Sequence, residues 1–262
     1  MTGKTGRMRY VSNAGLVLEA EGESIGIDLF SRDSSGMYPD TPPEIRQELL
    51  EEIGKGRLWT LIFTHDHGDH FCREDVWEAK RRAPGVAVIS TEPVIRALQA
   101  VEGDGLSAEE HACGKLTSVP CEETRAPCWI QAGPFRIGFL YTPHEGAQYV
   151  QVPNLTLLIE AVGQHWVVPG DAAASQELFA RIRRWSPVVD WFFLPFPYVG
   201  LRSSRNMLAE ALEIRQVFVL HQPRPEADVQ NWVGQAKRMC EHARDRLPKP
   251  VFPEGLGNWY EL

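Results

Sequence analysis

Short apolar runs and helical repeats alternate along the chain, with glycine, proline and polar turns between them. Apolar runs that are rich in β-branched and aromatic residues predict strands. We expect strands over residues 10–20, 24–28, 58–63, 86–90, 129–132, 135–141, 155–161, 165–168, 191–194 and 217–220. Apolar positions that recur every three or four residues predict helices over residues 44–52, 74–82, 93–100, 175–185, 203–214 and 228–246.

No repeat and no low-complexity linker interrupts this pattern, so we expect a single domain over residues 1–262. A chain of this length can form one large layered domain. Residues 102–126 are the least readable part, because they contain several glycines, Pro120 and two acidic pairs. Short edge strands are one interpretation of this segment.

The composition is that of an ordinary soluble globular protein, with 43% hydrophobic and 24% charged residues. A net charge of -8 argues against a dedicated nucleic-acid binder, whose domain is usually basic. No apolar run reaches the roughly 20 residues that cross a bilayer, and residues 1–9 lack the apolar core of a signal peptide. An odd number of cysteines without a C-x-x-C pair indicates reduced thiols, and hence a cytoplasmic location. They are Cys72, Cys113, Cys121, Cys128 and Cys240.

Residues 64–70, with the sequence Thr-His-Asp-His-Gly-Asp-His, form a heptad between a predicted strand and a predicted helix. The carboxyl end of a strand is where open α/β layers bind ligands. In an extended segment His65 and His67 point to the same side. Gly68 permits a sharp turn that lets Asp69 and His70 face the same cavity from another direction. One loop could thus serve two adjacent metal ions. The alternative is a His-rich surface loop, or a helix start capped by Asp69, but a cap needs a single polar residue.

Three further residues, His144, Asp171 and His221, lie just past the ends of predicted strands, as the heptad does. Each has an ordinary alternative: a core or surface histidine, a turn or helix-cap aspartate, and a loop histidine. Their shared placement favours one site, because strand ends that gather at one edge of a sheet can supply the ligands that a single loop lacks.

The heptad, followed by Pro143-His144, Gly170-Asp171 and Leu220-His221 in that order, resembles the metallo-β-lactamase superfamily of metallohydrolases. The opening residues 12–16 and the pair Ile27-Asp28 are similar to its L-ascorbate-6-phosphate-lactonase-like branch. The resemblance extends from about residue 10 to residue 221. It implies an α/β (α+β) fold, a four-layer αββα sandwich of two mixed β-sheets flanked by helices, with a dinuclear metal site at one edge.

The resemblance also implies how the ligands are divided between two divalent ions. The first ion is held by His65, His67 and His144. The second is held by Asp69, His70 and His221. Asp171 bridges the two ions, and Asp69 and Asp171 are the candidate catalytic carboxylates. Asp28 is a candidate for a carboxylate that orients a histidine ligand, or else an ordinary aspartate at a strand end.

Imidazoles and carboxylates suit zinc, which we expect, and also manganese or iron. Paired cations can lower the pKa of a bound water to about 7 and polarise a carbonyl or phosphoryl oxygen. The resemblance therefore implies a hydrolase of a small anionic ester, lactone or phosphodiester. An RNA-processing nuclease and an iron-dependent redox enzyme are the alternatives on the same fold, and a non-catalytic metal scaffold is a third.

Arg202 and Arg205 lie at a predicted helix start between two ligand-bearing segments. Two guanidinium groups beside free backbone amides suit a phosphate or carboxylate of a substrate. The alternative is a solvated helix cap with two surface arginines. As partners we expect a small-molecule substrate and neither a membrane nor a nucleic acid, and a homo-oligomer is compatible with the sequence.

Overall fold

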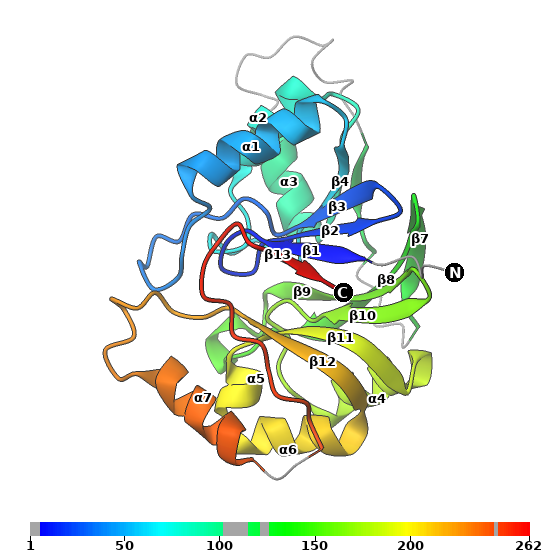
Figure 1. The fold of residues 1–262 in the computed structure, drawn as a ribbon. Helices are drawn as coiled ribbons and strands as arrows, with labels where there is room; N and C mark the ends of the chain where they lie inside the picture. The colour runs from blue at the N-terminus through cyan, green and yellow to red at the C-terminus, as the bar shows by residue number, and fades with distance from the viewer. Residues whose placement is uncertain (1–5, 102–114, 121–125, 244–245) are drawn as a thin grey trace.

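The computed structural model describes residues 6–101, 115–120, 126–243 and 246–262. Within these residues, two mixed β-sheets pack face to face, and helices cover the outer face of each sheet (Figure 1). The predicted α/β class and the αββα order of layers are therefore confirmed.

The first sheet has seven strands, and the four strands from β3 to β6 are parallel to one another. Their order is β13 (Trp259–Glu261), β1 (Arg7–Tyr10), β2 (Leu16–Ala20), β3 (Glu23–Ile27), β4 (Leu58–Ile62), β5 (Ala87–Ser90) and β6 (Leu116–Ser118). Three helices cover its outer face: α1 (Pro43–Gly54), α2 (Arg73–Arg82) and α3 (Glu92–Val101). β6 lies at the sheet edge, inside the segment for which short edge strands were one interpretation. The rest of that segment, residues 102–114 and 121–125, lies outside the described residues, as do Cys113 and Cys121.

The second sheet has six strands, of which β10, β11 and β12 are parallel. Their order is β12 (Glu213–Leu220), β11 (Val188–Pro195), β10 (Gln164–Val168), β9 (Pro153–Ala161), β8 (Phe135–Pro143) and β7 (Cys128–Ala132). The helices on its side are α4 (Gln176–Trp185), α5 (Pro197–Gly200), α6 (Arg202–Ala211) and α7 (Trp232–His242). A short 3-10 helix, η1 (Ala147–Tyr149), follows β8.

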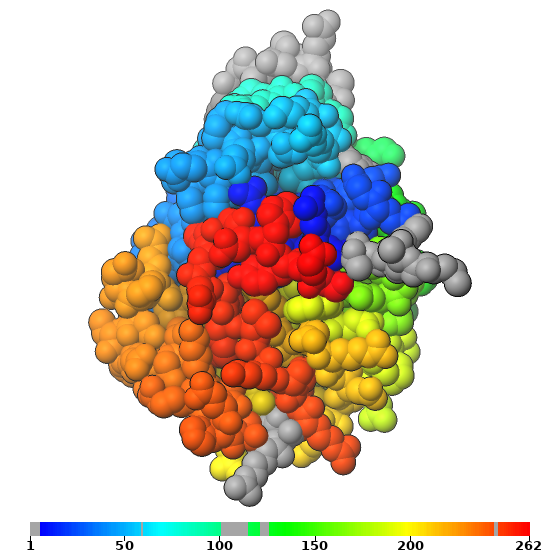
Figure 2. Space-filling model, in the orientation of Figure 1, coloured from blue at the N-terminus to red at the C-terminus, as the bar shows by residue number. Residues whose placement is uncertain are grey.

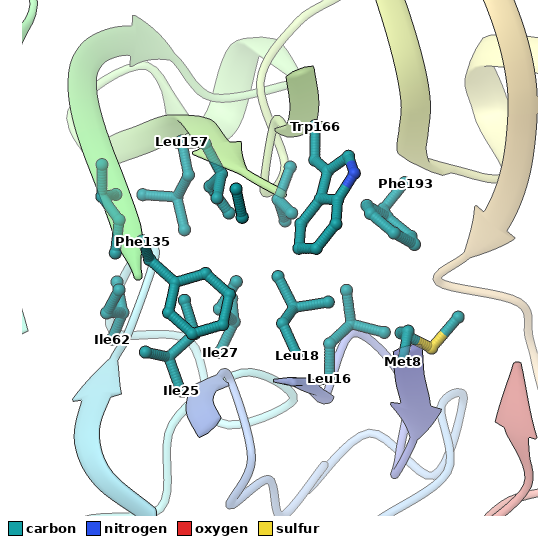
Figure 3. Close-up of a cluster of buried hydrophobic side chains, with 14 of the residues drawn as sticks. Met8, Leu16, Leu18, Ile25, Ile27, Ile62, Phe135, Leu157, Trp166 and Phe193 are labelled. Carbon is teal, nitrogen blue, oxygen red and sulfur yellow. The ribbon is translucent and has the colours of Figure 1, made fainter. Parts of the chain in front are cut away.

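The central core lies between the two sheets and joins side chains from both of them (Figure 3). Leu16, Leu18 and Ile27 of the first sheet face Phe135 and Trp166 of the second, and all five are fully buried. Each such side chain contributes about 1.5–3 kcal/mol of hydrophobic stabilisation. There are two further apolar clusters, one between the first sheet and its helices and one between the second sheet and its helices. No helix of the described residues combines the length and the apolar character that a bilayer span requires.

Two predicted helices differ from the structure in the C-terminal part of the chain. The helix predicted to end at residue 214 ends at Ala211, because Ile214 already belongs to β12 and faces the core. Within the range 228–246, for which one helix was predicted, the described residues form only α7, from Trp232 to His242. The Asp228 carboxylate accepts hydrogen bonds from the backbone N–H groups of Trp232 and Val233 at 2.6 and 3.0 Å, so the helix begins after it.

The C-terminal segment was not predicted to join either sheet, yet it contacts both. β13 pairs with β1 of the first sheet. Ahead of it, Val251 exchanges backbone hydrogen bonds with Val217 and Val219 of β12, at 2.8 and 2.9 Å. In the space-filling view this segment, coloured red, runs across the boundary between the two halves of the molecule (Figure 2).

Candidate metal centre

The heptad lies in the loop between β4, an interior strand of the first sheet, and α2. The backbone N–H groups of His70 and Phe71 donate to the carbonyl of His67, at 3.0 and 2.8 Å, and close a tight turn. Gly68 lies so near the carbonyl of Arg32 that a Cβ atom would be only 2.7 Å from that oxygen. The turn therefore requires glycine at this position, and it brings His70 back toward the strand end.

The three strand-end residues come from the second sheet. His144 follows β8, Asp171 follows β10 and His221 follows β12. An isolated bridge pairs His144 with Ala172, and the N–H of Glu145 donates to the carbonyl of Asp171 at 2.7 Å. These contacts hold the ends of β8 and β10 side by side. The structure thus brings the three residues to the heptad.

The seven predicted ligands form two groups, each of which could hold a metal ion. The three-histidine group is His65, His67 and His144, and the mixed group is Asp69, His70, Asp171 and His221. Within each group the ligand atoms lie within 4.8 Å of one another. The Oδ2 of Asp171 is 3.1 Å from the Nε2 of His221 and 3.7 Å from the Nε2 of His144. Asp171 therefore lies against both groups, where a bridging ligand would have to be.

Five ligand atoms are buried and form no hydrogen bond, although carboxylate oxygens of the mixed group lie 3.3 Å from the Nε2 of His70 and 3.0 Å from that of His221. They are the Nε2 atoms of His65, His70, His144 and His221, and the Oδ1 of Asp171. A buried polar atom without a partner costs about 1–3 kcal/mol, so five of them in one place need an explanation. Imidazole nitrogen and carboxylate oxygen are the donors that zinc, manganese and iron accept. Divalent ions bound here would satisfy these atoms, and the residues present fit such ions.

Asp28, which directly follows β3, is buried beside the mixed group and is only 1% exposed. Its Oδ2 lies 2.8 Å from the Nδ1 of His70. The backbone N–H and the hydroxyl of Thr64 donate to the same carboxylate at 2.8 and 2.7 Å. The Thr64 hydroxyl also lies 3.1 Å from the Nδ1 of His65. One aspartate thus contacts a ligand of the mixed group directly and a ligand of the three-histidine group through Thr64.

The two groups have opposite electrostatics in the absence of metal. Burial lowers the pKa of His70 and His221, but Asp171 and Asp69 outweigh it and raise the pKa of each histidine to about 10. Burial alone would raise the pKa of both carboxyls, yet the neighbouring imidazoles lower the pKa of each below its usual range. In the three-histidine group, burial and the charge of His70 lower the pKa of His65 well below its ordinary value.

Three residues that the sequence analysis did not assign to the site also border it. The ring of Tyr38 lies against His221, with ring centroids 4.1 Å apart, and the ring of Tyr149 lies 4.9 Å from that of His67. Asn13 is completely buried beside the mixed group. The tyrosines lie outside the predicted helices and strands, and only the resemblance to a superfamily branch singles out Asn13 in the sequence.

Arg202 and Arg205 are placed differently from each other. Arg202 is exposed at the start of α6, whereas Arg205 is buried with 3% exposure. The Nη1 of Arg205 lies 3.3 Å from the Sγ of Cys240 on α7. A role in substrate binding stays a prediction for both arginines, and the contact with α7 lends it no support. Cys72 is also buried, and its Sγ lies 3.5 Å from the carboxylate of Glu74.

No protein-family model matches this sequence, and no curated protein matches it. Several solved structures are similar in fold. YhfI, a metallo-β-lactamase fold protein from Bacillus subtilis, is 14% identical over 98% of this chain and 99% of that chain, with a TM-score of 0.64. Igni18, a metallo hydrolase from Ignicoccus hospitalis, is 15% identical over 98% of each chain, with a TM-score of 0.59.

CmlA, a diiron β-hydroxylase from Streptomyces venezuelae, is 14% identical over 100% of this chain and 54% of that chain, with a TM-score of 0.61. Identities this low establish a shared fold and leave the reaction open. The two sheets and their helices give this chain the metallo-β-lactamase fold, and the His/Asp cluster lies at one edge of it.

Proposed function

We propose that this protein is a metal-dependent hydrolase that binds two divalent ions. The observation that carries the proposal is the convergence of seven ligand side chains in two adjoining groups, with five of their atoms buried and unpartnered. A structural cluster of histidines would be expected to satisfy these atoms with hydrogen bonds inside the protein. A cluster that binds metal has a reason to leave them free.

Each group has its own part in the proposal. The three-histidine group holds one ion, the mixed group holds the other, and Asp171 contacts both. Asp28 orients His70 by accepting a hydrogen bond from its Nδ1–H, so that the Nε2 is available for metal. When bound, divalent ions supply Lewis-acid activation of water and of a substrate oxygen. The side chains of Asp69 and Asp171 are 13% and 12% exposed, and their carboxylates would help to hold the second ion.

For the substrate we propose a small anionic ester, lactone or phosphodiester, as in the lactonase-like branch of the superfamily. Two divalent ions bring four positive charges, whereas the seven ligands bring only two negative ones, from Asp69 and Asp171. The loaded site would therefore attract an anion. Zinc is the proposed native metal. A single domain, a cytoplasmic location and a homo-oligomeric state stay predictions.

Iron-dependent redox chemistry is the second candidate. The fold also occurs in a diiron β-hydroxylase, and a ligand set without sulfur accepts iron as readily as zinc. An RNA-processing nuclease has less support, because a net charge of -8 disfavours binding to a polyanion.

The proposal is tested by metal analysis and turnover on the same preparation. We expect about two zinc ions per chain in protein purified without added metal, and hydrolysis of bis-p-nitrophenyl phosphate or of a simple lactone. His67→Ala should abolish turnover with the fold retained, whereas His242→Ala, at an exposed histidine of α7, should leave turnover unchanged. Iron in place of zinc would favour the redox candidate, and cleavage of a precursor tRNA alone would favour the nuclease.

A further inference from the structure

The loop between β1 and β2 is buried at every position from residue 11 to residue 15, although it contains two polar residues, Ser12 and Asn13. It is closed by a hydrogen bond from the N–H of Val11 to the carbonyl of Gly15, at 2.8 Å. Neither of its polar residues belongs to the seven ligands. The Ser12 hydroxyl has no hydrogen-bond partner, whereas the side-chain amide of Asn13 forms a hydrogen bond outside the loop.

Asn13 contacts two metal ligands that come from different sheets. Its Nδ2 donates to the Oδ2 of Asp69 at 3.0 Å, and its backbone carbonyl accepts the N–H of His221 at 2.9 Å. A carboxylate only accepts hydrogen bonds, so the amide nitrogen must face Asp69. One residue of the β1–β2 loop therefore connects the heptad to the end of β12.

The backbone of His221 needs this support. Its φ of 58° lies in the left-handed region, which residues other than glycine adopt only when their surroundings hold them there. The carbonyl of Asn13 holds the N–H of His221, and the Nε2 of His221 lies 3.0 Å from the same Asp69 oxygen that Asn13 contacts. The amide, the carboxylate and the imidazole thus fix one another.

We propose that Asn13 is a positioning residue for the metal ion of the mixed group, with its side chain orienting Asp69 and its carbonyl orienting His221. The inference rests on the proposed function, because it takes the mixed group to hold an ion. In the structure both of its ligand contacts go to the mixed group, whereas two ligands of the three-histidine group are held elsewhere, His65 by Thr64 and His144 by the carbonyl of Glu145. Removing the amide should therefore weaken one ion and spare the other.

The test titrates metal-free protein with zinc alone and follows each binding step by calorimetry. Asn13→Ala should weaken one of the two zinc sites by about 10- to 100-fold, the usual effect of losing such an outer contact, and leave the other within about 2-fold. Asn13→Asp keeps the shape and the backbone carbonyl but sets a carboxylate against Asp69. It should weaken the same site at least as much.

Ser12→Ala is the matched control, because it removes a buried hydroxyl without a hydrogen-bond partner from the same loop. It should leave both zinc affinities unchanged. Equal weakening of both sites by Asn13→Ala, or no weakening, overturns the inference while the proposed function stands. Failure of both Asn13 variants to fold without metal also overturns it, because Asn13 would then support the fold as a whole. Wild-type protein that binds fewer than two zinc ions overturns the proposed function and this inference together.

Discussion

The two halves of the metal centre are built on different physical principles. In the three-histidine group, burial lowers the pKa of His65 and His67 below the ordinary histidine value. The Nδ1 of His144 lies 2.7 Å from the carbonyl of Glu145, so a backbone dipole orients this ligand. His65 and His67 can therefore bind a cation without first losing a proton.

The mixed group contains two carboxylates and two histidines whose pKa values are raised to about 10 by those carboxylates. Without metal, protons on His70 and His221 take the place of the cation. The comparison teaches that burial alone does not define a metal site. The charges beside each histidine decide whether a metal ion binds an imidazole that is already unprotonated or has to displace a proton from it.

Loss of the shared carboxylate should have the largest effect, because Asp171 contacts both halves. Asp171→Ala should lower turnover by about 1,000-fold or more, equivalent to about 4 kcal/mol, since both ions lose a ligand. Metal content and turnover are measured together. Asp66→Asn removes an exposed acid of the heptad and should change neither. Selective loss of one ion from Asp171→Ala would show that the halves do not share this residue.

Removal of metal should destabilise the whole fold, because each half takes ligands from both sheets. At a free zinc concentration near 1,000 times the dissociation constant, binding adds about 4 kcal/mol to the free energy of unfolding. For a chain of this size, that corresponds to a melting temperature roughly 10 °C lower after chelation. Differential scanning calorimetry with and without a chelator measures the change. An unchanged melting temperature would mean that the cluster is held together without metal.

Zinc binding should release protons from one half only. His70 and His221 hold a proton up to about pH 10 in metal-free protein, whereas an unperturbed histidine has already lost it at pH 8. At pH 8 we therefore expect about two protons to be released for each chain that binds two zinc ions. The number should fall toward zero as the pH rises past 10. Calorimetry in buffers of different ionisation enthalpy counts these protons, and a count of zero at pH 8 would remove the contrast between the halves.

The smallest expected effect concerns Tyr149, which borders the three-histidine group. The ring of Tyr149, which is 40% exposed, packs edge-on against His67 and His144. Tyr149→Ala should weaken zinc at the three-histidine group by about 2- to 10-fold, because an aromatic contact contributes about 0.5–1.5 kcal/mol. Tyr149→Phe keeps the ring and should bind zinc as the wild type does. Val150→Ala, at the exposed neighbouring position, controls for loss of apolar surface.

The sequence predicts the strands and the ligand-type residues that follow them for a local reason, whereas the order of layers in the sandwich is what the family resemblance implies. Each ligand segment is an apolar strand followed at once by a polar residue, and that signal is complete within a few residues. The heptad adds a glycine where the chain must turn against Arg32. The meeting of His144 and Asp171 follows from the resemblance, because nothing local specifies that β8 and β10 end side by side.

The supporting residues could not be found in the same way. Asn13 is 56 residues from Asp69, and its loop has the composition of any hairpin turn. Tyr38 reaches His221 only because Arg224 donates hydrogen bonds to the carbonyls of Met37 and Tyr38, at 2.8 and 2.6 Å. These are pairings between irregular segments, for which the sequence carries no period. The ends of α6 and α7 were misplaced because tertiary contacts, and not helical spacing, decide them.

The C-terminal crossing has a consequence for association between molecules. Open strand edges offer unpaired backbone groups to any neighbouring chain, and native proteins shield them. β13 pairs with β1, and the residues around Val251 pair with part of β12. One C-terminal segment therefore covers an edge of each sheet. If that segment were displaced, both edges would become templates for aggregation at once, and exchange of the segment between two copies would yield a swapped dimer.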